Sequence, residues 1–161
     1  MISLEHNGTT YDGFTAEELS ARGVPDAVID QAINQKLSAE ANRRILGMLD
    51  GVYTNSTALD AIYAEKEREA KAYRDEGYPA SVPEGSYRFI VGEAQARGLT
   101  KRQHADAVIA AAEAFRQIGS VAEALRAELP AQIAAADTLQ AKRSVVTAAL
   151  TQLKSTIEGA Q

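Results

Sequence analysis

The chain contains no cysteine and no tryptophan, and only 6% of its 161 residues are aromatic. The lack of cysteine excludes disulfide bonds, thiolate catalysis and thiolate metal sites, and it fits a reducing compartment. Alanine supplies much of the 45% hydrophobic fraction. The core must therefore be built largely from small side chains, which favours closely packed helices over a thick β-sandwich.

A basic cluster and a long apolar run are also missing. The formal net charge is −5, and the 22 acidic and 17 basic residues are mixed along the sequence. Nucleic acids and anionic membranes bind concentrated lysine and arginine, so we expect neither as a partner. No run of about 18 apolar residues occurs, and the first residues lack the basic and apolar regions of a signal peptide. We expect a soluble cytoplasmic product.

Familiar catalytic and cofactor motifs are absent from the sequence. It has no HExxH or EF-hand pattern, no GxSxG around a serine and no glycine-rich phosphate loop. The two histidines, His6 and His104, have no carboxylates at metal-ligand spacing. We therefore predict no catalytic residue, no metal and no cofactor, and a protein that is not an enzyme.

The N-terminal residues predict a β-hairpin. Asn7-Gly8 lies between short alternating stretches, and both residues tolerate the positive φ of a tight hairpin turn. An isolated hairpin is marginally stable, so this one must lie on a helix or pair with strands of another chain. Thr15 and Glu18 then predict a capping box for a short helix that ends at Gly23.

A longer helix is predicted from Pro25 to Asp50-Gly51, with an interruption allowed near Ser38. Its apolar residues recur at spacings of three and four: Val28, Ile29, Ile33, Leu37, Ala41, Ile45, Met48 and Leu49.

A central helix is predicted from about Ser56 to Gly77. Spacings of three and four place one set of residues on a single face: Leu59, Ile62, Tyr63, Lys66, Ala70 and Tyr73. The charged residues between them are predicted to point mostly outward: Glu65, Glu67, Arg68, Glu69 and Lys71.

Lys66 is the one chemical alternative, because it lies on the apolar face of this helix. A lysine in a dry pocket can act as a nucleophile or base. More often the stem covers neighbouring rings and the ammonium reaches water or an acid, here Glu69 or Glu93. We favour this second interpretation.

Two prolines and flanking glycines mark the clearest break in the chain, at residues 78–85. We divide the sequence into an N-terminal hairpin with helices (1–51), which could be an attachment module, a central amphipathic helix (52–78), a linker (79–85) and a C-terminal helical part (86–161). The last part begins with a short helix ending at Gly98. A second capping box follows at Thr100 and Gln103.

A seven-residue repeat runs through the C-terminal part, and all but Gln132 and Arg143 of its seam positions are apolar. The repeat predicts helices packed along a seam, in a coiled coil or an antiparallel hairpin. We predict that its large apolar residues form helix-packing or oligomer contacts: Val108, Phe115, Ile118, Leu125, Leu129, Leu139, Val146, Leu150, Leu153 and Ile157.

Pro130 interrupts this repeat. It either kinks one continuous helix, at a cost of roughly 3 kcal/mol, or begins a separate last helix after a turn at 128–131, which is the simpler alternative. The predicted fold class is mainly α, with an N-terminal β-hairpin and short helices followed by a helical bundle that ends in a long heptad-patterned helix or helical hairpin.

Four stretches resemble small helical proteins of tailed bacteriophages and prophages, encoded among tail and tail-fibre genes. They are the run Ala41–Ile45, the block YAEKEREAKAY at 63–73 with the following Tyr78-Pro79, the turn Gly98–Thr100 and the alanine-rich stretch Ala131–Ala136. The resemblance covers roughly residues 39–153. It contains no catalytic signature and transfers no functional residue, and the hairpin and the helices of 15–34 lie outside it.

The resemblance implies a structural component of the phage tail, at the tail tip or a fibre attachment, or else a tail-fibre assembly chaperone that is not retained in the virion. Its partners would be other tail or fibre proteins and further copies of itself, with a homotrimer suiting tail symmetry. It would occupy the host cytoplasm during assembly and the virion tail if it is structural. An inhibitor directed at the host is a further alternative.

Overall fold

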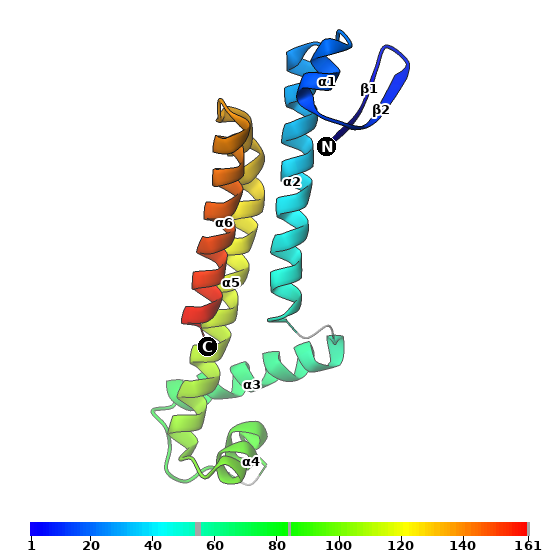
Figure 1. Ribbon diagram of the computed structural model, residues 1–161. Helices are drawn as coiled ribbons and strands as arrows, with labels where there is room; N and C mark the ends of the chain where they lie inside the picture. The colour runs from blue at the N-terminus through cyan, green and yellow to red at the C-terminus, as the bar shows by residue number, and fades with distance from the viewer. Residues whose placement is uncertain (54–55, 84, 161) are drawn as a thin grey trace. The chain divides into compact units, whose positions relative to one another are not determined.

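The protein is mainly α-helical with one N-terminal β-hairpin, as predicted (Figure 1). The structure is a computed structural model that describes residues 1–53, 56–83 and 85–160. Its elements in chain order are β1 (Ile2–His6), β2 (Thr9–Phe14), α1 (Ala16–Ala21), α2 (Asp26–Asp50), α3 (Thr57–Asp75), α4 (Arg88–Arg97), α5 (Lys101–Ala135) and α6 (Leu139–Gly159).

The chain forms two compact units that are not consecutive in sequence. Unit 1 consists of residues 1–49 and 120–159, and unit 2 consists almost entirely of residues 50–119. The helix α5 is thus shared, because its first part belongs to unit 2 and its last part to unit 1.

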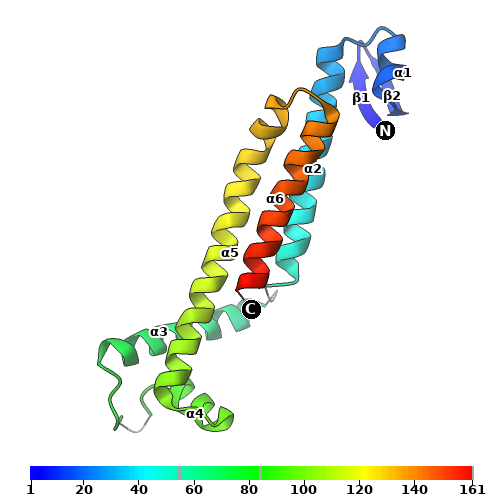
Figure 2. The same cartoon turned by 60° about the vertical axis from the view of Figure 1, so that its left-hand side comes forward.

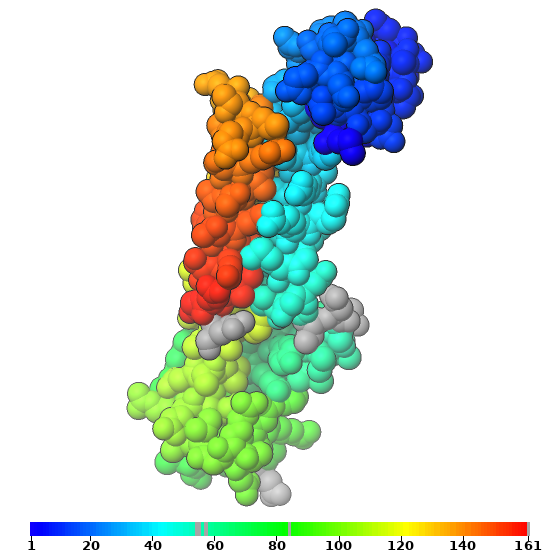
Figure 3. All heavy atoms as spheres, viewed as in Figure 1, coloured from blue at the N-terminus to red at the C-terminus, as the bar shows by residue number. Residues whose placement is uncertain are grey.

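The hairpin packs on helices of its own chain, within unit 1. Asn7 and Gly8 adopt positive φ angles of 48° and 74°, and His6 pairs with Thr9 across the turn. Apolar residues of the hairpin, α1 and α2 form one cluster: Ile2, Leu19, Val24 and Ile29, with Leu4, Tyr11 and Phe14 against them. The space-filling view shows these segments as one continuous body (Figure 3). The hairpin therefore has the helical support that the sequence required.

The caps and the length of the helices in unit 1 follow local chemistry. Thr15 and Glu18 form the predicted capping box, with Thr15 N donating to the Glu18 carboxylate at 2.8 Å and Glu18 N to Thr15 Oγ1 at 3.2 Å. The helix α2 runs through Ser38 without a break.

The last part of α5 and α6 form an antiparallel helical hairpin, with α2 alongside (Figure 2). Polar contacts of two side chains, Arg126 and Lys142, join the three helices within unit 1. Arg126 Nε donates to Asn42 Oδ1 at 2.6 Å. The ammonium of Lys142 is buried and contacts Asp30, Asn34 and the carbonyl oxygen of Ile133.

The simpler interpretation of Pro130 was wrong. The helix α5 continues through Pro130 to Ala135, and the chain turns at residues 136–138. Pro130 is exposed, whereas Leu129 and Ile133 on either side are almost completely buried, so packing offsets the lost hydrogen bond. The turn lies where Thr138 can cap α6, and its Oγ1 accepts from Ala141 N at 3.1 Å.

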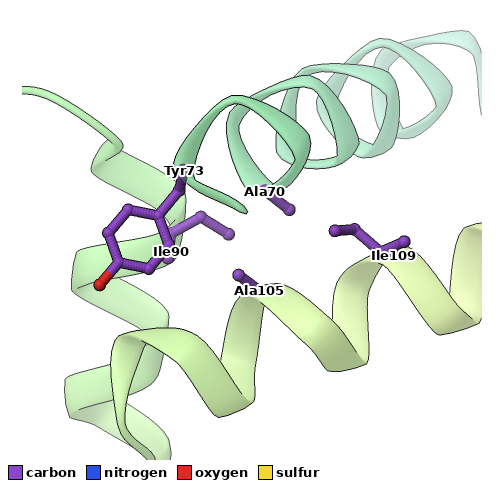
Figure 4. Close-up of a cluster of buried hydrophobic side chains, with 5 residues drawn as sticks. All are labelled: Ala70, Tyr73, Ile90, Ala105 and Ile109. Atoms are coloured by element: carbon purple, nitrogen blue, oxygen red, sulfur yellow. The ribbon is translucent and has the colours of Figure 1, made fainter. Parts of the chain in front are cut away.

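The core of unit 2 joins α3, α4 and the first part of α5. It contains Ala70 and Tyr73 from α3, Ile90 from α4, and Ala105 and Ile109 from α5 (Figure 4). The Tyr73 hydroxyl donates to Pro79 O at 3.1 Å, so the chain after α3 is held against this core.

Glu69 caps α4 from the side of α3. The Glu69 carboxylate accepts hydrogen bonds from Phe89 N at 2.8 Å and Ile90 N at 3.4 Å. Tyr87, at the N-cap, makes no such side-chain bond. The prediction that Glu69 points outward was therefore wrong, because the free amides of α4 attract a carboxylate from a neighbouring helix.

Candidate interaction surface

The predicted apolar face of α3 is divided by the structure into a packed half and an exposed half. Tyr73, toward the C-terminal end, is buried in the core of unit 2. Leu59, Ile62 and Tyr63, toward the N-terminal end, have exposed fractions of 38%, 38% and 51%. Because residues three and four apart are neighbours on a helix, the three side chains form one exposed apolar strip, which we call the α3 strip.

Lys66 stands at the border between the two halves. Its ammonium forms an ion pair with Glu93 of α4, which confirms Glu93 as one of the two predicted acid partners. The rings of Tyr63 and Phe89 lie 5.6 and 5.7 Å from the same nitrogen, within cation–π range. Lys66 thus links α3 to α4, about one helical turn beyond the α3 strip toward the C-terminal end of α3.

A second exposed apolar group in unit 2 is formed by Tyr53 and Phe115. Their ring centroids are 5.7 Å apart, and the Tyr53 hydroxyl donates to Phe115 O at 2.7 Å. A Cβ on Gly119 would come within 3.0 Å of that hydroxyl, so glycine leaves room for the contact. Phe115 was a predicted seam residue, yet it is 43% exposed.

Glu67 connects α3 to α5 next to the strip. Its carboxylate accepts from Arg116 at 2.6 Å and from Lys71 at 2.7 Å. These hydrogen bonds, the one from Lys71 first, hold the pKa of Glu67 below its usual value despite the opposing effect of burial. Like Glu69, Glu67 was predicted to point outward, and its packing against α5 corrects that prediction.

Most of the other predicted seam residues are buried within the chain, as helix-packing residues: Ile118, Leu125, Leu129, Val146, Leu150 and Leu153. Val108 and Ile157 are half-buried. Leu139 is 41% exposed, and the seam position Arg143 is also exposed while its neighbour Lys142 is buried. Within α6, the predicted seam therefore fails only at the start of the helix, where residue 142 and not 143 is buried, whereas Val146, Leu150 and Leu153 keep their predicted positions.

Two buried polar residues, Lys142 and His104, were not identified as core residues from the sequence. A lysine and a histidine are rarely fully buried, so composition gives no signal for either. The interruption at Arg143 did indicate a polar residue near this place in the seam, but one position away.

Within the described ranges, no three histidine, aspartate or glutamate side chains are grouped so as to hold a metal ion. Across the same residues, every helix is too short or too polar to span a bilayer.

The fold and the surface together define a mainly α protein with a helix-borne apolar strip. Comparison with protein-family models, curated proteins and solved structures finds no match to this chain.

Proposed function

We propose that the protein is a structural component of a bacteriophage tail, at the tail tip or a fibre attachment, and that it acts by packing the α3 strip against a neighbouring protein. The resemblance of residues 39–153 to phage tail-associated proteins supports the setting. The exposure of Leu59, Ile62 and Tyr63 supports the mode of contact. Apolar side chains grouped on one helix face are typical of helix-packing interfaces.

The α3 strip is a better contact surface than the C-terminal seam. Leu125, Leu129 and Leu153 are already buried by the chain itself, so a partner could reach them only if unit 1 opened. The α3 strip needs no such rearrangement. The tyrosine in the strip suits an interface, because its ring buries apolar area while its hydroxyl remains able to form a hydrogen bond.

The setting is tested by quantitative mass spectrometry of washed phage particles. A structural component is present in a fixed copy number, with multiples of three expected for a trimer. Absence from particles, together with binding to a fibre protein in infected cells, would identify an assembly chaperone instead. If the protein is absent from particles, does not bind a fibre protein and is a monomer at micromolar concentration, the proposal is contradicted.

The mode of contact is tested by replacing Ile62 with Asp. A charge in the centre of an apolar interface removes a typical hot-spot contribution of about 2 kcal/mol, so incorporation into particles or affinity for the partner should fall by about 30-fold. Circular dichroism should show an unchanged fold, because Ile62 is exposed.

Ala61→Asp is the matched control for Ile62→Asp. Ala61 is exposed and lies in the same helix, away from the strip. Ala61→Asp introduces the same residue and the same change in charge, and it lowers helix propensity more than Ile62→Asp does, because alanine is the better helix former. Equal loss in the two variants would show that the α3 strip is not the contact surface.

A further inference from the structure

His104 is buried in unit 2 with one ring nitrogen unpaired. Only 3% of the residue is exposed. Over the part of the chain that the structure describes, Nε2 has no hydrogen-bond partner. A buried polar atom without a partner is unusual in a folded protein and carries a desolvation cost.

The groups that face His104 form a small charged cluster. From α4, Glu93 Oε2 lies 3.5 Å from Nε2, and Arg97 lies 3.9 Å from that same carboxylate oxygen. From α3, Lys66 binds the other oxygen of Glu93. One carboxylate is thus shared by two permanent cations and by a histidine that can become a third.

We propose that His104 is a proton-sensitive latch, so that α4 stays packed on α3 and α5 while the imidazole is neutral and separates from them when the imidazole takes up a proton. A protonated His104 would place a desolvated positive charge beside Lys66 and Arg97, with Glu93 as their single shared anion. Hydration of the charged ring requires the helices to part. The latch does not depend on the phage-tail proposal.

The direction of the pH effect follows from the pKa of His104. Burial lowers this pKa below its ordinary value of 6.5, and the attraction of Glu93 only partly opposes that effect. The closed form therefore binds fewer protons than the open form below pH 6.5. Stability from the neutral imidazole is fully present above pH 6.5 and is lost as the pH falls toward the lowered pKa.

The acidic groups of the cluster act in a different pH range. Burial raises the pKa of Glu93, but the hydrogen bond and charge of Lys66, with the charges of His104 and Arg97, outweigh burial and leave the pKa below 4.5. The stability that Glu93 contributes is therefore lost only below pH 4.5. Between pH 6.5 and 4.5, loss of protection in unit 2 reports on His104.

Amide hydrogen exchange of the full chain between pH 7.5 and 5.0, corrected for the intrinsic exchange rate, tests the latch. Protection of amides in α4 and the first turns of α5 should fall by up to about tenfold per pH unit below 6.5, the limit for one proton. His104→Gln, which cannot take up a proton there, should abolish this fall. His6→Gln, in the hairpin of unit 1, should retain it.

NMR titration of the wild-type imidazole provides a second measurement that does not need a folded variant. The His104 ring signals should titrate below pH 6.5. Titration at or above pH 6.5, or an equal loss of protection in His104→Gln and wild type, would overturn the latch.

Discussion

Replacing Leu153 with Ala should lower the free energy of unfolding by about 2 to 5 kcal/mol, because the side chain is completely buried and its removal leaves a cavity. Leu139 occupies the equivalent position of the heptad repeat in the same helix, but it is 41% exposed. Leu139→Ala should cost less than about 1 kcal/mol. Urea unfolding followed by circular dichroism measures both.

This pair of variants separates packing inside the chain from packing between chains. If a partner completed the seam, the two substitutions would lower the free energy of unfolding by similar amounts in the assembled form. In the isolated protein, both would have little effect. A large loss for Leu153→Ala in the monomer, with Leu139→Ala nearly neutral, is the result expected from the structure. Similar values in the monomer would contradict the burial of α6 described above.

Lys142→Met should destabilise unit 1 by about 2 to 3 kcal/mol. Methionine keeps the apolar stem but removes the ammonium that contacts Asn34 Oδ1 at 2.7 Å and Ile133 O at 3.2 Å. The Asn34 oxygen then loses its donor, and Ile133 O keeps only the hydrogen bond from Ala136 N at 3.3 Å. This loss of stability is smaller than that expected on breaking a fully buried ion pair. The Asp30 carboxylate, 3.1 Å from Lys142 Nζ, is half exposed and can be hydrated once the ammonium is removed.

Lys154→Met is the matched control for Lys142→Met. Lys154 lies in the same helix, is exposed and forms a surface pair with Glu158 at 3.6 Å. Its replacement should change the free energy of unfolding by no more than about 0.5 kcal/mol. A Lys142→Met protein as stable as Lys154→Met would show that desolvation of the ammonium cancels the energy of its contacts.

Features set by neighbouring residues were predictable from the sequence. The turn at Asn7-Gly8 and the capping boxes at Thr15 and Thr100 all formed as predicted, and the second box has Gln103 N donating to Thr100 Oγ1 at 3.1 Å. Each depends on residues no more than three positions apart, and the side-chain chemistry alone selects the backbone conformation.

The start of the last helix was not predicted, although one signal for it was present. A heptad pattern gives the spacing of apolar residues but not the place where a helix ends, so the pattern was continued through 136–138. Thr138 before Ala141 has the spacing of an N-cap, and its hydroxyl does cap α6. Had the N-cap at Thr138 been weighed against Pro130, the turn would have been predicted at 136–138 and not at 128–131.

Contacts between residues far apart in the sequence could not be predicted from it. Glu69 is twenty residues from the amide it caps, and Lys142 is more than a hundred from Asp30. A charged residue on a helix surface looks the same in the sequence whether it meets water or another helix. For the same reason, the sequence of α3 shows that the helix has an apolar face but not which turns of that face other helices bury.

The division of unit 1 into two separate segments has a consequence for folding on the ribosome. Residues 50–119 emerge before residues 120–159, so unit 2 can assemble while α2 still lacks Arg126 and Lys142, its polar partners on α5 and α6. Domains generally fold as soon as their residues are available. The face of α2 that packs on α5 and α6 is therefore among the last parts of the early-translated segment to reach its native contacts, and its apolar side chains need protection during that interval, whereas the hairpin cluster can form earlier.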